Sequence, residues 1–221
     1  METSVNFATS VAGFDYWLNG EDSRRHVVAG GFCYNKRMLY TGKGDDGKTR
    51  IFGCDQRISK SSSVVEALGA LDEINSFLGL VKVAAKDAVY SFAVYGALTD
   101  IVHRMQEHLF IIQAELAGAE KSITPDHLAW LERLVQDIER ELPPIRTFFI
   151  SGGTELAARF DVARTLARRA ERRIVAVAEE GQIKLSDTTR AYLNRLSSAL
   201  YALARLANHL SGITEEPPQY T

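Results

Sequence analysis

The sequence predicts an all-α protein in which five amphipathic helices form one bundle behind an irregular N-terminal segment. From about residue 64 onward, apolar residues recur at steps of three and four, the period of a helix that buries one side. No alternation of strand and helix patterns interrupts this stretch. With 221 residues, 46% of them hydrophobic, the chain is long enough to bury one substantial core or at most two small ones.

Apolar stripes mark the first, second and fifth helices. The first stripe ends at Val81, the second covers residues 98–116, and the fifth helix extends from about residue 188 to 209. The first two stripes consist of Ala67, Leu71, Ile74, Leu78 and Val81, and of Leu98, Val102, Met105, Leu109, Ile112 and Leu116. Burying one such leucine contributes roughly 1.5–3 kcal/mol, so five faces of this kind hold a bundle together without a sheet.

The third and fourth helices carry start and stop signals as well. In the third, Thr124 is a candidate N-cap, Pro125 takes the first helical position, and the proline pair 143–144 stops the helix. The fourth follows a glycine pair, starts with Thr154 as its cap and ends at Gly181.

Composition narrows the class of protein. The formal net charge of −2 gives no general attraction to nucleic acid or to anionic lipid. The two cysteines, Cys33 and Cys54, form neither a zinc spacing nor a redox CxxC pair, which favours a reduced, cytoplasmic setting. No apolar run approaches 18 residues and the N-terminus lacks a basic region followed by an apolar core, so neither a membrane span nor a signal peptide is expected.

A phosphate-binding P-loop pattern occurs in residues 41–50, TGKGDDGKTR, as Gly42, four intervening residues, and then Gly47, Lys48 and Thr49. A P-loop requires a buried strand before the pattern and an amphipathic helix that starts at the Lys-Thr pair. Only the short MLYT precedes it, and the following RIFGCDQRISKSSS is no amphipathic helix. A P-loop NTPase is therefore the less favoured interpretation.

The same stretch remains suited to a polyphosphate. Glycine, lysine, threonine and arginine supply backbone N–H groups and cations, whereas Asp45 and Asp46 would oppose phosphate unless a metal such as Mg²⁺ lay between. The alternative is a solvated hairpin turn.

Arginines gather in the fourth helix, within ARFDVARTLARRAERR at residues 158–173. Three lie four apart on one helical face and two lie beside them: Arg164, Arg168 and Arg172, with Arg169 and Arg173. One interpretation is a solvated face laced with salt bridges. The helix is otherwise rich in alanine, which permits close approach of neighbours and favours placing the arginines at a cleft, where Asp72 of the first helix is a natural partner.

Two further candidates carry less weight. His103, Glu107 and His108 suggest a metal, but no Glu-x-x-His pair occurs on the helices, so we interpret them as satisfied surface or core residues and expect no metal site. The arginine helix lacks the interleaved aromatic residues of an RNA-binding surface.

Four blocks of sequence together resemble the PduO-type ATP:cob(I)alamin adenosyltransferases. They read YTGKGDDGKTRIFG, RISKSSSVVEALGALDEINSFLG, FFISGGTELAARFDVARTLARRAERRIV and YLNRLSSALYALARLAN, and the resemblance covers residues 38 to about 210. It implies a ferritin-like five-helix bundle, typical of cobalamin adenosyltransferases, that assembles as a homotrimer with active sites between adjacent subunits. The reaction implied is transfer of the 5′-deoxyadenosyl group of ATP to the cobalt of reduced cobalamin, with release of triphosphate.

The resemblance also divides the chain. Residues 1–37 would be an extension of unknown role, 38–63 the ATP-binding loop segment, 64–212 the helical bundle and 213–221 a C-terminal tail.

Site residues follow position by position from the resemblance. ATP, with Mg²⁺, is expected to contact Thr41, Gly42, Lys43, Gly44, Asp45, Gly47, Thr49, Arg50 and Lys60 from the loop, and Arg168, Arg169, Glu171, Arg172 and Asn194 from the helices. Arg164 matches the arginine that pairs with the helix-one aspartate, here Asp72. Phe148 matches the aromatic residue that crowds the lower face of the corrin. The chain departs from the family at Asp161, where histidine is frequent, and at Ser151, which replaces a proline.

The implied chemistry needs no general base, because cobalt itself attacks carbon. Removing the axial ligand eases reduction of Co(II) to the Co(I) nucleophile, while cationic groups stabilise the departing triphosphate. A cobalamin reductase and a downstream coenzyme-dependent enzyme are the further partners implied. A P-loop NTPase and a non-catalytic structural or regulatory bundle remain as alternatives.

Overall fold

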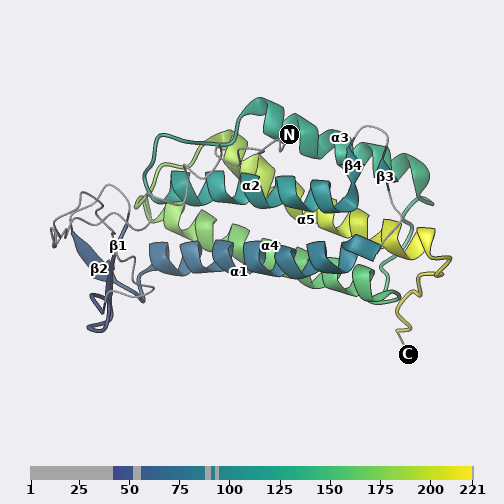
Figure 1. Ribbon diagram of the computed structural model, residues 1–221, viewed down its shortest axis with the longest axis horizontal. Coiled ribbons are helices and arrows are strands. Elements are labelled where there is room, and N and C mark those ends of the chain that lie inside the picture. The colour runs from purple at the N-terminus through teal and green to yellow at the C-terminus, as the bar shows by residue number, and fades with distance from the viewer. Residues whose placement is uncertain (1–41, 52–55, 88–90, 93–94, 221) are drawn as a thin grey trace, which may run out of the picture.

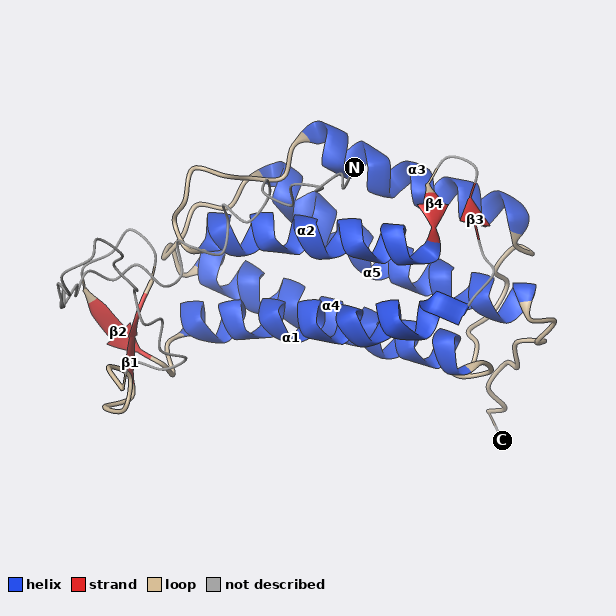
Figure 2. Cartoon of the chain, in the orientation of Figure 1, coloured by secondary structure: helices blue, strands red, loops and turns tan. Residues whose placement is uncertain are grey.

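The computed structural model describes residues 42–51, 56–87, 91–92 and 95–220. This part of the chain contains five α-helices, as the sequence predicts (Figures 1 and 2). Their bounds are α1 Ser63–Ala84, α2 Leu98–Leu116, α3 Pro125–Glu141, α4 Glu155–Glu179 and α5 Asp187–Leu210, and a short 3₁₀ helix, Ala85–Asp87, follows α1. None of the helices in these ranges has the length and apolar composition needed to cross a bilayer.

The apolar stripes form the core of the bundle. Helix α1 packs against α2 and α4, and α5 packs against α3 and α4. Every member of the first two predicted stripes is buried, and so are Phe160 of α4 and Tyr192 of α5. The periodicity of the sequence therefore identified the buried faces of α1 and α2 correctly.

The predicted helix signals are confirmed. The Thr124 hydroxyl accepts a hydrogen bond from His127 N at 3.4 Å, and the Thr154 hydroxyl accepts one from Ala157 N at 3.1 Å, as N-caps do. Gly181 follows the end of α4 with φ of +72°, a left-handed conformation that glycine adopts without steric cost.

The structure also contains two short hairpins, whose strands were not predicted, although a hairpin turn was one interpretation of residues 41–50. Strands β1 (Lys48–Arg50) and β2 (Arg57–Ser59) pair antiparallel with Thr49 opposite Ile58, and β3 (Ser91–Phe92) pairs with β4 (Gly96–Ala97). Strands of two or three residues are too short for an alternating pattern to appear in the sequence. The first hairpin lies within the segment expected to bind ATP, beyond the N-terminal end of α1 (Figure 1).

The start of α4 is fixed to the end of α5 through Asn208. The Asn208 amide accepts from Thr154 N at 3.0 Å and donates to Gly152 O at 2.9 Å. Gly153 has φ of +94°, and a Cβ at this position would overlap the Asn208 amide. Only glycine allows this close approach, which anchors the segment before α4 at the same end of the bundle as the C-terminus (Figure 1).

Candidate functional site

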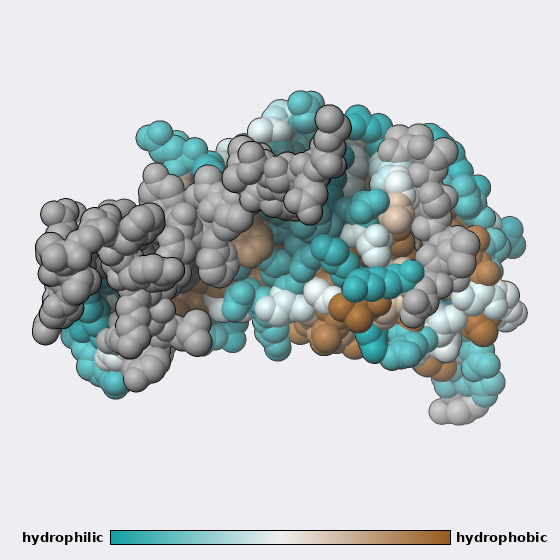
Figure 3. All heavy atoms as spheres, viewed as in Figure 1, coloured by the Kyte–Doolittle hydropathy of each residue, from teal (hydrophilic) through white to brown (hydrophobic). Residues whose placement is uncertain are grey.

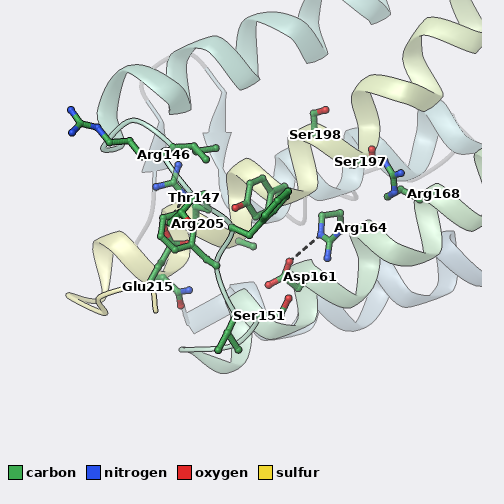
Figure 4. Close-up of a pocket in the computed structure, with 17 residues that line it drawn as sticks. Arg146, Thr147, Ser151, Asp161, Arg164, Arg168, Ser197, Ser198, Arg205 and Glu215 are labelled. Atoms are coloured by element: carbon green, nitrogen blue, oxygen red, sulfur yellow. Dashed lines mark hydrogen bonds and ion pairs between the residues drawn. The ribbon is translucent and has the colours of Figure 1, made fainter. Parts of the chain in front are cut away.

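A cavity of about 560 Å³ opens between α4, α5, the segment 145–151 and the C-terminal tail (Figure 4). Polar and aromatic side chains meet there, among them Phe148, Asp161, Arg164, Arg168, Tyr201 and Arg205. Burial raises the pKa of the Tyr201 phenol, so this ring stays neutral at the cavity wall. A hollow of this size with a few converging charges is the usual form of a small-molecule site.

Arg164 projects into this cavity from α4. Its Nε donates to Asp161 Oδ1 at 3.1 Å, and its guanidinium lies 5.9 Å from the centre of the Tyr201 ring (Figure 4). Asp161 is 9% exposed, so the pair neutralises a carboxylate that would be costly to bury alone. Arg164 is thus held by a residue on its own helix.

Within one chain, Arg164 pairs with Asp161 and not with Asp72, so the predicted pair with Asp72 stays a prediction for the assembled protein. The two helices do pack together, as predicted, but Asp72 is exposed on α1. Helix α4 presents Arg169 and Arg173 to α1, where they pair with Glu73 and Glu66. Arg164 lies on a different side of α4, which faces α5, so the two residues do not meet within one chain.

The predicted nucleotide residues of the helices are divided between two environments. Arg168 lines the cavity, whereas Arg169 forms its ion pair with Glu73 outside it. Asn194 Nδ2 donates to Glu171 Oε1 at 3.1 Å, which joins α5 to α4 one turn beyond Arg168. Arg172 is exposed. Both interpretations of the arginine helix therefore hold, each for different arginines.

Phe148 stands at the rim of the cavity with 79% of its surface exposed. Its neighbour Phe149 lies beneath Arg205, with the guanidinium 5.2 Å from the ring centre. An aromatic ring left this exposed beside a cavity is available to a ligand, as the resemblance implies for Phe148.

The glycine-rich loop folds around one arginine. Arg57 donates to both carboxylate oxygens of Asp46, at 2.6 and 2.8 Å, and to the carbonyls of Lys43 and Lys48. The Arg57 guanidinium lowers the pKa of Asp46 below its usual range. Gly42 and Gly47 have φ of +68° and +76°, which permits the tight turn between them.

Lys60 belongs to this loop. Its backbone N donates to Gly47 O at 2.9 Å, and a Cβ at Gly44 would lie 3.0 Å from its Nζ. Asp45 and Arg50 are exposed on the loop and Thr49 is half-buried, while Thr41, Cys33 and Cys54 lie outside the described residues. The loop thus groups a lysine with the glycines expected to bind phosphate.

The P-loop interpretation is wrong. Lys48 and Thr49 lie in strand β1 and not at the start of a helix. Phosphate binding of the P-loop kind depends on helical N–H groups directly after the lysine, and this loop has none there.

Loop and cavity lie far apart within the chain. Ser63 Oγ donates to Glu180 Oε2 at 2.7 Å, which ties the loop end of α1 to the far end of α4. Arg164 lies more than four helical turns before Glu180, about 24 Å along α4 at 1.5 Å per residue. One chain therefore does not bring the two groups of predicted residues together.

The two histidines of α2 lie at the surface and in the core, as expected: His103 is exposed and His108 is buried. His108 is hydrogen-bonded to Tyr192 at 2.9 Å through Nδ1, and its ring centre lies 4.4 Å from that of His127. Burial, together with the nearby His127 and Arg104, lowers the pKa of His108 to about 4, so it is neutral. Exposed His103 contacts Lys82 and Glu107. No group of three or more potential metal ligands occurs within the described ranges.

Several residues of the site escaped the sequence analysis. Arg57 belongs to no recognisable motif, and Arg205 is a single charged residue in a leucine-rich helix, so neither was identified as a site residue. Glu215 lies in the tail, where no pattern marks it. Asp161 could have been identified from the sequence, because it precedes Arg164 by three residues, which is the spacing of an ion pair on a helix.

Together, the fold and the cavity define a helical-bundle protein with a basic, aromatic-rimmed pocket and a separate glycine-rich loop. Residues 39–207 match the family model described as Cobalamin adenosyltransferase. The chain belongs to the cobalamin adenosyltransferase family, which confirms the resemblance carried by the four sequence blocks.

Individual relatives agree with this assignment. The corrinoid adenosyltransferase PduO of Citrobacter freundii is 39% identical over 178 residues, which are 77% of this chain and 50% of that protein. That of Salmonella typhimurium is 37% identical over 76% of this chain and 48% of its own length. The chain therefore spans about half the length of these PduO relatives. A corrinoid adenosyltransferase of Bacillus subtilis is 36% identical over 79% of this chain and 89% of its own.

A solved structure shares the fold. It is a phenylalanine-to-histidine variant of the PduO-type ATP:corrinoid adenosyltransferase from Lactobacillus reuteri, complexed with cobalamin and ATP. It superposes with a TM-score of 0.73 at 31% identity, covering 83% of this chain and 97% of that one.

Proposed function

We propose that this protein transfers the 5′-deoxyadenosyl group of ATP to the cobalt of reduced cobalamin and releases triphosphate. The observation that carries the proposal is the cavity itself, which combines the exposed Phe148 with the guanidinium groups of Arg164 and Arg168. Family membership and the bound cobalamin and ATP of the related structure support the same chemistry.

In this proposal the cavity receives cobalamin. Phe148 crowds the lower face of the corrin and displaces the axial ligand of cobalt, which eases reduction of Co(II) to Co(I). Arg164, held by Asp161 and Tyr201, contacts the corrin, while Arg168 leads towards the nucleotide. The reduced cobalt then attacks C5′ of ATP and the C5′–O bond breaks, so the electron pair leaves with triphosphate.

The loop binds the triphosphate of ATP. Lys60, the glycine backbone and the exposed Arg50 supply donors and positive charge to the leaving group. Arg57 holds the loop in shape without facing the substrate. Asp45 is exposed on the same loop, and we propose that its carboxylate contacts the Mg²⁺ that accompanies ATP.

The complete site forms between adjacent subunits of a homotrimer. A triphosphate is far shorter than the separation of loop and cavity within one chain, which supports a site in which the loop of one subunit serves the cavity of its neighbour. Apolar residues gather over α1, where Leu80 and Val83 are 55% and 59% exposed (Figure 3). Such an exposed apolar face is suited to a subunit interface. Asp72 on the same helix would then meet Arg164 of the next subunit.

The test is incubation with ATP and chemically reduced cobalamin. The proposal predicts the light-sensitive spectrum of adenosylcobalamin together with one inorganic triphosphate per turnover. Release of orthophosphate without cobalamin would indicate an NTPase, and the absence of any product would indicate a non-catalytic bundle. A cytoplasmic location, a supplying reductase and a downstream coenzyme-dependent enzyme remain predictions.

A further inference from the structure

The C-terminal tail is bound to the cavity by a buried ion pair. Arg205 Nε donates to Glu215 Oε2 at 2.8 Å, and the two side chains are only 6% and 16% exposed. Breaking such a pair leaves an uncompensated buried charge, which is strongly unfavourable. Glu215 therefore continues the cavity wall beyond α5.

The same tail holds the segment that carries Phe148. Ile150 N donates to Glu216 O at 2.8 Å, and Arg205 Nη2 donates to Pro143 O at 3.2 Å. Arg205 also covers the ring of Phe149. Segment 143–150 is thus held by hydrogen bonds on both sides of Phe148, one to Arg205 and one to the tail.

Phe148 itself has little packing to hold it. With 79% of its surface exposed, its position depends on the backbone of its neighbours. We propose that Glu215 is a positioning residue, which orients Arg205 and thereby fixes the segment that presses Phe148 against the corrin. The inference rests on the proposed function.

The effect should be confined to cobalamin. The ion-pair partner of Glu215 is Arg205, which holds the Phe148 segment, and not Arg168, the cavity residue assigned to the nucleotide side. Loss of the ion pair should therefore impair displacement of the axial ligand from cobalt while leaving ATP binding intact.

Glu215→Gln tests this directly, with Glu216→Gln as the matched control. Glu216 contributes its backbone carbonyl and its side chain is exposed, so the control makes the same charge change without breaking the pair. We expect Glu215→Gln to lower kcat/KM for Co(II) cobalamin about tenfold or more, with KM for ATP unchanged within about twofold. The absorption and electron paramagnetic resonance signature of ligand-free Co(II) should also weaken. Glu215→Asp should recover part of both signals.

A second measurement does not depend on catalysis. The amide of Ile150 should exchange with deuterium about tenfold faster in Glu215→Gln than in Glu216→Gln. Equal exchange in the two variants, or an equal loss of ATP and cobalamin kinetics, would overturn the inference. An inactive wild-type protein with the expected exchange difference would instead refute the proposed function and leave the positioning of the segment established.

Discussion

Arg164 and Asp161 form an ion pair on one face of α4, inside the cavity, with 3.1 Å between Nε and Oδ1. The arginine is 27% exposed and the aspartate 12%, so neither charge is fully solvated. Arg164 lines the cavity, where we propose that it contacts the corrin and the Asp72 of a neighbouring subunit. Within one chain, Asp161 thus neutralises the charge of Arg164.

Asp161→Asn should lower the free energy of unfolding by about 1–2 kcal/mol, because it removes a charged acceptor from a half-buried arginine. Asp72→Asn, on the exposed face of α1, should change it by less than about 0.5 kcal/mol at protein concentrations where the subunits are separate. Chemical denaturation of both variants measures the difference.

A double-mutant cycle locates the partner of Arg164. Asp161 and Arg164 should couple at every protein concentration, whereas Asp72 and Arg164 should couple only where the oligomer forms. Strictly additive effects for Asp72 and Arg164 in the assembled protein would mean that the two residues do not touch across subunits either.

Lys60→Ala should weaken ATP binding about tenfold or more, and Lys48→Ala by less than about threefold. Lys60 lies against Gly44 in the loop, while Lys48 occupies β1 and lacks the helix that gives a P-loop lysine its role. Isothermal titration calorimetry with ATP measures the dissociation constant of each variant and shows which one binds ATP more weakly. A larger loss for Lys48 would contradict the assignment of the phosphate site.

Arg57→Ala should also weaken ATP binding, although Arg57 is not expected to touch ATP. It removes the two bonds to Asp46 and those to the Lys43 and Lys48 carbonyls, so the loop loses its fixed shape. Arg57→Lys keeps the charge but not the planar fork, and should recover little. If lysine restored full affinity, charge alone and not loop geometry would be the contribution of this residue.

His108 should make stability depend on pH. Its pKa in the folded protein, about 4, lies below the 6.5 of an unperturbed histidine, so the unfolded chain binds the extra proton between these values. The free energy of unfolding is therefore unaffected by the protonation of His108 above about pH 7. Below that it decreases as the pH falls towards 4, by up to about 1.4 kcal/mol per pH unit.

The variant His108→Asn, which keeps a polar group for Tyr192, should flatten this part of the pH profile. Exposed His103→Asn on the same helix is the control and should leave the profile unchanged. Parallel profiles for wild type and His108→Asn would show that His108 is not buried as a neutral ring.

Phe148→Ala should slow adenosylation when Co(II) must be reduced on the enzyme and should matter much less with Co(I) supplied. Because the ring is 79% exposed, the free energy of unfolding should change by less than about 0.5 kcal/mol. Phe110→Ala, which removes a 54% exposed ring from α2, is the matched control. Equal losses with Co(II) and Co(I) would show that Phe148 does not act on cobalt ligation.

The sequence predicted features that follow from local patterns, such as apolar stripes and helix caps. It did not predict features that depend on how distant segments pack against one another. Stripes such as Leu71 to Leu78 and caps such as Thr124 are local, so the helices and their buried faces were predictable. Which side of α4 faces α5 depends on packing between distant segments, so the pairing of Arg164 with Asp161 inside the cavity was not predicted. The contribution of Glu215 depends on where the tail returns, which no local pattern encodes.

Complementation between two inactive variants tests whether one subunit's loop serves its neighbour's cavity. Lys60→Ala disables the loop and Arg168→Ala the cavity. After joint denaturation and reassembly, adenosylcobalamin should form at about a quarter of the wild-type rate, the share of interfaces that pair an intact loop with an intact cavity. A mixture no more active than the separate variants, while wild type reassembled in the same way recovers its activity, would contradict a site shared between subunits.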